Sequence, residues 1–182
     1  MRFVIASTGA SGSIYLQRLL DALYEQGHEI HLVLSGYAHQ VVKEEIDQLN
    51  KPEGIIEHSD RSMNAPFASG STQFDGMVVV PCSMGTLGRI ASGTSESLIL
   101  RSADVFLKER RKLILVARET PWNLIQARNV VRVMEAGAIF LPAMPSFYSR
   151  PTDLNAVADT VVWRILDQLG APAPNACRWK ET

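Results

Sequence analysis

A short loop rich in glycine and hydroxyl groups lies near the start of the chain. Residues 8–13 read TGASGS and stand between an apolar run at 2–7 and a stretch with helical spacing. The two glycines let the backbone approach a ligand closely, and Thr8 and Ser11 can donate hydroxyls to phosphate oxygens. The loop lacks the Gly-Lys-Ser/Thr of a P-loop and a complete dinucleotide fingerprint, so by itself it also fits a tight turn with a serine cap.

Small, hydroxylated or charged residues also follow the later apolar runs. The segments are LSG at 34–36, PCSMGT at 81–86, ARETP at 117–121 and LPAMP at 141–145. In a doubly wound sheet, ligands bind beyond the carboxyl ends of the strands, where a helix N-terminus favours an anion. The sequence therefore predicts a crevice for a large planar ligand that carries a phosphate.

The elements that must position these segments alternate along the chain. Short apolar runs are typical of strands that are buried on both faces. They occur at 2–7, 29–35, 76–82, 112–117 and 138–142. Helical spacing separates them, most clearly between Leu154 and Leu169, where apolar residues recur at steps of three and four. This alternation predicts an α/β fold, a doubly wound parallel sheet with helices on both faces.

Two segments fall outside that alternation. Residues 49–74 have little periodicity, so we expect a long surface excursion there. The tail from Ala171 is rich in proline and polar residues, and Trp179 predicts that its end packs against the rest of the protein. No internal repeat or linker divides the 182 residues, so we expect a single domain over 1–182.

Composition excludes several classes of protein. A net charge of -1 provides no global field for nucleic acid or an anionic membrane. No apolar run approaches the roughly 18 to 20 residues of a spanning helix, and the N-terminus has no signal-peptide pattern. Cys82 and Cys177 lie far apart, which favours a reducing cytoplasm, with Cys82 as a buried structural thiol. The four histidines show no metal-ligand spacing, so we predict no metal.

Several motifs in order resemble the UbiX-type flavin prenyltransferases, also known as the small subunit of aromatic acid decarboxylase systems. They are TGASGS, PCSMGTL at 81–87, LILRSADVFLKERRKLILVARETP at 98–121 and FYSRP at 147–151. The resemblance spans essentially the whole chain and implies a flavodoxin-like fold that binds FMN. It also implies transfer of a dimethylallyl group from dimethylallyl phosphate to N5 and C6 of reduced FMN. The prenylated FMN would serve a partner, a UbiD-type decarboxylase.

The resemblance assigns residues to both ligands. Residues at four strand ends would bind FMN: Gly9, Ala10, Ser11, Ser35, Ser83, Met84, Gly85, Thr86 and Arg118. Tyr148 and Arg164 would bind dimethylallyl phosphate, and the reaction site would be completed by Arg101, Lys108 and Glu119.

The residue types suit that chemistry. Fixed cations and a phenol donor stabilise the charge that develops on a departing phosphate. Because the chain has no Asp-Asp-x-x-Asp cluster like those that hold magnesium in diphosphate prenyltransferases, we expect these cations to act in place of a metal. Closure of a ring onto C6 requires loss of a proton, and the resemblance gives that role to Glu119.

The predicted elements separate two of these residues. A helix over 96–111 descends from the carboxyl edge of the sheet, so Lys108 should lie near the opposite edge, whereas Glu119 follows the next strand back. About six strand residues of roughly 3.3 Å each separate the two by about 20 Å in one chain. A site that uses both must lie between subunits, so we expect an obligate homo-oligomer with interfacial active sites.

The assigned residues also fit purely structural roles. Arg101 and Lys108 suit the solvated face of helix 96–111, where cations meet the negative end of the dipole. Glu119 suits a cap for a helix over 122–136.

Other roles and functions also stay open. Arg164 suits an exposed position beside the apolar stripe, and Tyr148 suits a plug at the edge of the core. Two other functions remain: an FMN-dependent decarboxylase of cysteinyl substrates, and a non-enzymatic FMN carrier or accessory subunit. The first needs a substrate clamp rich in Asn and Met, which PAMPSFYSRP at 142–151 lacks.

Overall fold

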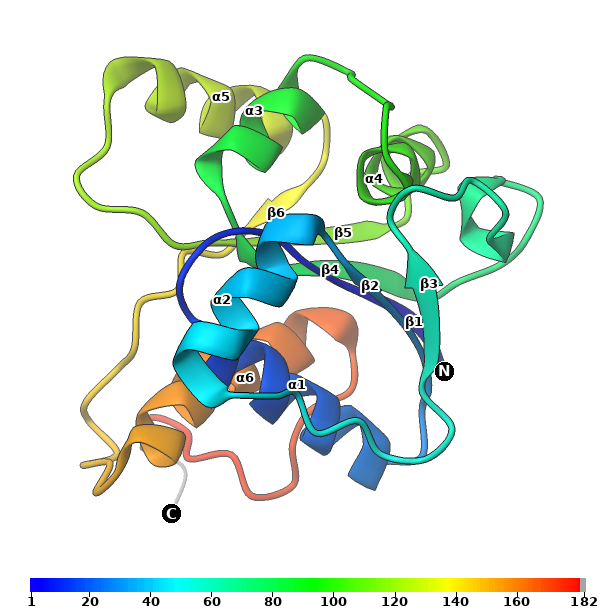
Figure 1. Ribbon diagram of the computed structural model, residues 1–182. Helices are drawn as coiled ribbons and strands as arrows, with labels where there is room; N and C mark the ends of the chain where they lie inside the picture. Colours follow the sequence, from blue (N-terminus) through cyan, green and yellow to red (C-terminus); the bar gives the residue numbers. More distant parts are fainter. Residues whose placement is uncertain (181–182) are drawn as a thin grey trace.

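Within residues 1–180, which the computed structural model describes, six parallel strands form one sheet with helices on both faces (Figure 1). The strand order is β3-β2-β1-β4-β5-β6, so the predicted doubly wound α/β fold is confirmed. The strands are β1 (Arg2–Ser7), β2 (Glu29–Leu34), β3 (Ile56–Ser59), β4 (Gly76–Cys82), β5 (Lys112–Ala117) and β6 (Ile139–Phe140). Without the edge strand β3, the order is that of flavodoxin.

The helices form a layer on each side of the sheet. One face is covered by α1 (Ser13–Glu25) and α6 (Leu154–Leu169), with α2 (Gly36–Ile46) packed beside α1. The other face is covered by α3 (Met84–Ala91), α4 (Leu98–Lys108) and α5 (Leu124–Glu135). The short 3-10 helix η1 (Pro66–Ala68) packs against α4. The layers α1/α6 and α3/α4/α5 are thus separated by the sheet.

Each face of the sheet has its own hydrophobic core. Successive side chains of a strand point to opposite faces, so β1 contributes to both cores. Phe3 and Ile5 pack with the buried residues of α1 and α6, while Val4 and Ala6 pack with those of α3 and α4. This burial on both faces explains why the strands are continuous apolar runs instead of alternating ones.

Capping side chains set the ends of the later helices. Asn123 caps α5 in a capping box with Gln126, so the suggestion that Glu119 caps this helix is wrong. Glu119 instead accepts the N–H of Thr120 on Oε1 at 3.1 Å. The C-terminal end of α6 is set by Gly170, whose φ of 80° lies in the left-handed region that favours glycine.

Several element boundaries differ from those predicted. The helix expected over 96–111 is α4 (Leu98–Lys108), because the hydroxyl of Ser97 accepts the N–H of Leu100 and starts the helix there. The strand expected over 138–142 is only Ile139–Phe140. The backbone beyond Phe140 still donates to β5, from Leu141 to Leu115 at 3.0 Å and from Ala143 to Ala117 at 2.8 Å, so the chain follows β5 past the end of the regular strand.

Residues 49–74 were expected to form a surface excursion, but part of this segment belongs to the sheet and to the hydrophobic core. Four of its residues form β3, which pairs with β2, and the side chain of Phe67 is fully buried. Phe67 stacks edge-on against His31 and His58, whose rings lie parallel 5.1 Å apart. Burial of a phenylalanine contributes roughly 1.5–3 kcal/mol, so this ring anchors the excursion to the sheet edge. A strand of four mostly exposed residues leaves no periodic signal in the sequence.

The end of the tail packs as predicted from Trp179. The centroid of the Trp179 ring lies 5.6 Å from that of the Tyr148 ring, in an edge-on contact.

Across the part of the chain that the structure describes, none of the helices has both the length and the apolar character needed to cross a bilayer.

Candidate active site

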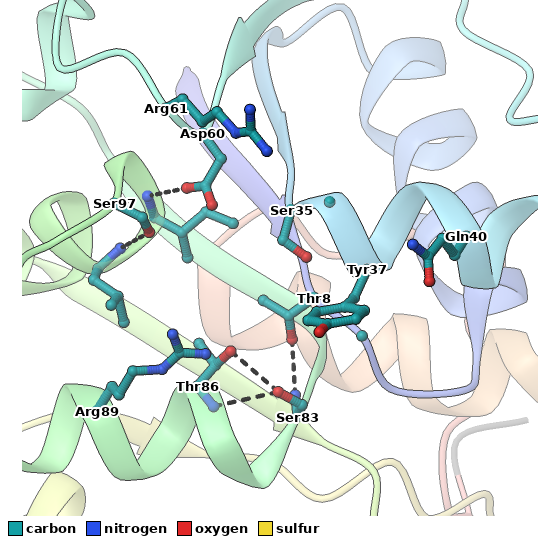
Figure 2. Close-up of a pocket in the computed structure, with 14 residues that line it drawn as sticks. Thr8, Ser35, Tyr37, Gln40, Asp60, Arg61, Ser83, Thr86, Arg89 and Ser97 are labelled. Atoms are coloured by element: carbon teal, nitrogen blue, oxygen red, sulfur yellow. Dashed lines mark hydrogen bonds between the residues drawn. The ribbon is translucent and has the colours of Figure 1, made fainter.

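The N-termini of α2, α3 and α4 converge on one cavity of about 600 Å³ (Figure 2). The residues that begin these helices, Ser35, Ser83 and Ser97, all line it. Each hydroxyl accepts the backbone N–H of the third residue after it, at 3.1, 3.2 and 3.4 Å respectively. The positive ends of these three helix dipoles therefore meet at one volume, and α2 and α3 also present first-turn N–H groups there, which favours an anion such as a phosphate.

The first loop forms another wall of this cavity. Thr8 Oγ1 donates to the carbonyl of Pro81 at 3.1 Å and accepts the N–H of Ser83 at 2.8 Å, which ties the ends of β1 and β4 together. Gly9 passes so close to α2 that an added Cβ would lie 2.5 Å from Cβ of Tyr37. Only glycine lets the loop and this helix approach to that distance.

Charged side chains at the rim come from segments that the sequence analysis did not assign to the site. Asp60 accepts the N–H of Ile99 at 2.9 Å at the start of α4, and Arg89 pairs with Glu96 at 3.1 Å. The lining residues that the sequence analysis missed are Tyr37, Gln40, Asp60, Arg61, Arg89, Ser97, Ile99 and Leu100. A serine directly before an apolar helical run could have revealed Ser97, whereas the aperiodic segment around Asp60 offered no signal.

The N-terminus of α1, where the sequence analysis expected an anion, is occupied by the chain's own carboxylate. Gly12 N–H donates to Glu45 Oε2 at 2.9 Å, and Ser13 N–H donates to the same atom at 2.7 Å. Burial raises the pKa of Glu45, but hydrogen bonds from the Ser11 hydroxyl and from Ser13 and Gly12 outweigh it, so the pKa lies below the ordinary value. Asp60 binds the N–H groups of Leu98 and Ile99 at the start of α4 in a similar way. The N-termini of α2 and α3 are therefore the ones that keep N–H groups for a phosphate.

The residues predicted to bind FMN lie in two groups. Gly9, Ser35, Ser83 and Thr86 line the cavity. The other five, which do not line it, are Ala10, Ser11, Met84, Gly85 and Arg118. Among these, Ser11 and Arg118 are in contact, since Arg118 Nε donates to the carbonyl of Ser11 at 3.1 Å. The end of β5 is thus tied to the first loop, next to the cavity wall formed by Gly9.

Tyr148 and Arg164 line a second cavity, of about 450 Å³. Arg164 projects from α6, and Tyr148 belongs to the segment between β6 and α6. The structure thus brings the two predicted binders of dimethylallyl phosphate together. Its other walls include Trp163 and the tail.

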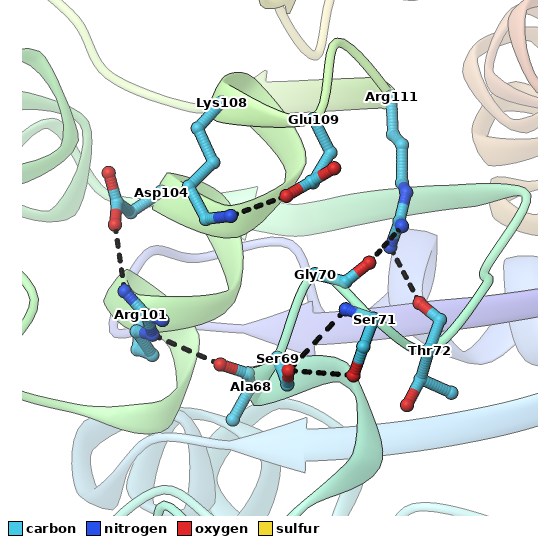
Figure 3. Close-up of polar contacts among 10 residues, drawn as sticks. All are labelled: Ala68, Ser69, Gly70, Ser71, Thr72, Arg101, Asp104, Lys108, Glu109 and Arg111. Atoms are coloured by element: carbon cyan, nitrogen blue, oxygen red, sulfur yellow. Dashed lines mark hydrogen bonds and ion pairs between the residues drawn. The ribbon is translucent and has the colours of Figure 1, made fainter.

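Arg101 and Lys108 lie in a third place, on α4 beside residues 68–72 (Figure 3). Arg101 Nε donates to the carbonyl of Ala68 at 3.0 Å, and its Nη1 pairs with Asp104 at 3.1 Å. Lys108 pairs with Glu109. As predicted, Lys108 ends α4 just before β5 begins, and Glu119 is exposed two residues beyond the end of β5. Because α4 and α6 cover opposite faces of the sheet, one chain does not bring Lys108 and Arg164 together.

Cys82 is not placed for nucleophilic chemistry. Complete burial raises the pKa of its thiol to about 12, so the thiolate is scarce at neutral pH. Among the described residues, no group of three or more His, Cys, Asp or Glu side chains could hold a metal ion.

Comparisons with known proteins agree over the full length. The family model described as Flavoprotein matches residues 1–166. The flavin prenyltransferase UbiX of Methanocaldococcus jannaschii is 43% identical over 183 residues, with 98% of each chain covered. The crystal structure of AnUbiX in complex with FMN and dimethylallyl pyrophosphate has a TM-score of 0.93 at 42% identity and covers 100% of this chain and 98% of that one. A dodecameric FMN-dependent UbiX-like decarboxylase from Escherichia coli O157:H7 has a TM-score of 0.92 at 38% identity, with 99% and 100% covered.

The contact between Glu45 and the first loop predicts a pH-dependent loss of stability. Glu45→Ala should lower the free energy of unfolding at pH 7 by about 1 kcal/mol, the usual cost of removing a helix N-cap. Because the pKa of Glu45 in the folded protein lies below its ordinary value of 4.5, this contribution is complete above pH 4.5 and is lost as the pH falls through the lowered pKa. Urea unfolding curves of the variant and wild type should therefore differ at pH 7 and converge in acid.

The neighbouring exposed residue supplies the control for this measurement. Glu44→Ala removes the same charge without touching the loop and should leave the unfolding curve at pH 7 unchanged. Identical curves for Glu45→Ala and wild type at pH 7 would show that the carboxylate does not cap α1.

Proposed function

The chain belongs to the UbiX family of flavin prenyltransferases, and we propose that it transfers a dimethylallyl group from dimethylallyl phosphate to N5 and C6 of reduced FMN. The product is prenylated FMN, the cofactor of a UbiD-type decarboxylase. The observation that carries this proposal is the convergence of the N-termini of α2, α3 and α4 on one cavity next to the first loop. That arrangement suits the phosphate of FMN.

Different walls of this cavity bind different parts of FMN. The first turns that follow Ser35 and Ser83 bind the phosphate through backbone N–H groups and hydroxyls. Arg118 and the backbone of the first loop orient the isoalloxazine, and the contact from Arg118 to the carbonyl of Ser11 holds the two together. When bound in its reduced form, the flavin supplies the nucleophilic nitrogen and carbon.

The head group of the allyl donor is bound by Tyr148 and Arg164. As the bond between the allylic carbon and the phosphate oxygen breaks, the electron pair leaves with the phosphate. Arg164 and the Tyr148 hydroxyl stabilise that charge, together with Arg101 and Lys108 of a neighbouring subunit, and no metal is needed. Glu119 accepts the proton that leaves C6 when the second carbon bond forms.

The distribution of these residues supports a homo-oligomer with interfacial active sites. Lys108 and Arg164 lie on elements that cover opposite faces of the sheet, so a second copy must complete the site. The outer face of α5 also exposes large apolar side chains: Leu124, Ile125, Val131 and Met134 are between 53% and 70% exposed. Such a stripe suits contact with another copy of the chain.

Further features support the proposed compartment, the domain organisation and the choice between functions. Both described cysteines are free thiols, and Cys177 is exposed, which suits a reducing cytoplasm. All of the strands from β1 to β6 belong to one sheet, which supports a single flavoprotein domain over 1–182. The alternatives, an FMN-dependent decarboxylase of cysteinyl substrates and a non-enzymatic FMN carrier, are not favoured, because the full-length relatives are named flavin prenyltransferases.

The direct test is to incubate the protein anaerobically with reduced FMN and dimethylallyl phosphate and to weigh the flavin by mass spectrometry. We expect a gain equal to one prenyl unit, with metal chelator present throughout. A tight complex with FMN of unchanged mass would favour a carrier. In a separate incubation with oxidised FMN and a cysteinyl peptide, release of carbon dioxide would favour the decarboxylase, in which the flavin accepts the two electrons.

The role of Glu119 has its own test. Glu119→Gln removes the base but keeps the size of the side chain, so it should retain FMN and still form the first carbon bond. With FMN deuterated at C6, the wild type should lose the deuterium as the ring closes, whereas the variant should keep it. Loss of the deuterium at the wild-type rate in the variant would remove Glu119 from this role.

A site shared between subunits predicts complementation between two inactive variants. Glu119→Gln and Lys108→Ala each inactivate every site when expressed alone. In oligomers that contain both chains in equal amounts, about one quarter of the interfacial sites receive both wild-type residues, so about a quarter of the activity should return. No recovery in oligomers shown by mass spectrometry to be mixed would place both residues in one chain's site.

A further inference from the structure

The C-terminal tail forms one wall of the cavity that contains Tyr148 and Arg164. The tail residues that line it are Ala176, Cys177, Arg178 and Trp179. The hydroxyl of Tyr148 donates to the carbonyl of Cys177 at 3.5 Å, and the rings of Tyr148 and Trp179 meet edge-on with centroids 5.6 Å apart. The tail therefore contacts one of the residues assigned to the allyl donor.

A single carboxylate in this cavity binds two guanidinium groups. Asp167 lies on α6, three residues after Arg164, and its Oδ2 accepts Arg164 Nη1 at 2.9 Å. Arg178 approaches the same carboxylate with both of its terminal nitrogens, at 2.7 Å to Oδ1 and 3.2 Å to Oδ2. The side chain of Asp167 is only 16% exposed, whereas that of Arg164 is 60% exposed. Asp167 therefore holds the two arginines side by side.

The charges of these groups do not cancel. The guanidiniums contribute two positive charges, and the carboxylate supplies one negative charge. Over the described residues that line the cavity, this leaves one positive charge. Two planar guanidinium donors suit a phosphate or pyrophosphate group, because guanidinium forms bidentate hydrogen bonds to such oxygens. Arg164 and Asp167 by themselves sum to zero charge, so the second cation, Arg178, is what makes this pair of arginines attractive to a dianion.

We propose that Arg178 is a further residue that binds the phosphate head group of the allyl donor, and that Asp167 is the positioning residue that holds Arg178 beside Arg164. This inference rests on the proposed function, which assigns Tyr148 and Arg164 to the donor. The tail thus belongs to the substrate site, and its deletion removes a binding group.

The test compares Arg178→Gln with wild type in FMN-loaded protein. The KM for dimethylallyl phosphate should rise about tenfold or more, which corresponds to the loss of one charged hydrogen-bonding partner. The kcat should change by less than about threefold, and the affinity for FMN should stay the same, because the phosphate of FMN is bound in the other cavity. Titration with inorganic phosphate, followed by calorimetry, should show binding weakened by the same factor as the KM.

Two further variants separate the cation from the shape of the tail. Arg178→Lys keeps the charge and loses the bidentate geometry, so its KM should lie between those of wild type and Arg178→Gln. Asp167→Asn should also raise the KM, because it releases Arg178 from Arg164. The matched control is Arg2→Gln, which removes an arginine of similar exposure, 38% against 34%, from an ion pair with Glu29 at the amino edge of the sheet. It should leave the KM and phosphate binding unchanged.

Two outcomes would overturn the inference. One is an unchanged KM and unchanged phosphate binding in Arg178→Gln. The other is a joint loss of kcat, FMN affinity and thermal stability, which would make Arg178 a structural residue of the tail. Phosphate titration does not depend on catalysis and therefore separates this inference from the proposed function. If wild type failed to prenylate FMN, the proposed function would be contradicted, whereas weakened phosphate binding in Arg178→Gln would still support the phosphate site.

Discussion

The positions of the N-termini of α2, α3 and α4 at the carboxyl edge of the sheet determine where an anion can bind. Parallel strands end at one edge, and each of these helices starts there with a serine that accepts one N–H. The other first-turn N–H groups stay available in α2 and α3, whereas in α4 those of Leu98 and Ile99 are bound by Asp60. The N-terminus of α1 lies at the same edge, but Glu45 occupies it. The fold therefore provides one cavity in which a phosphate can bind and blocks the N-terminus of α1 with a carboxylate.

The sheet also separates the chemistry into two halves. Arg101 and Lys108 lie on the α4 side, whereas Arg164, Asp167 and the tail lie on the α6 side. Because side chains cannot cross a layer of packed strands, we propose that Arg101 and Lys108 act on an allyl donor bound by a second copy. The proposed site therefore needs a homo-oligomer, and the exposed apolar stripe on α5 offers a surface for contact between copies.

The sequence was most informative where local signals matched the final packing. Continuous apolar runs predicted the strands buried on both faces, and the apolar spacing from Leu154 to Leu169 gave the bounds of α6. Ser35 and Ser83 could be assigned because motifs mark them. β3 could not be predicted, since four mostly exposed residues at the edge of the sheet show no hydrophobic period. Glu45 could not be assigned either, because its carboxylate reaches a loop about thirty residues earlier through tertiary contact alone.

We propose that the N-termini of α2 and α3 bind the phosphate of FMN, and the affinities of the protein for FMN and for riboflavin provide the most direct test. The two flavins share the isoalloxazine and the ribityl chain, so any difference in affinity reports on the phosphate. The account predicts that FMN binds roughly 100-fold more tightly or better. Equal affinity for the two flavins would contradict it.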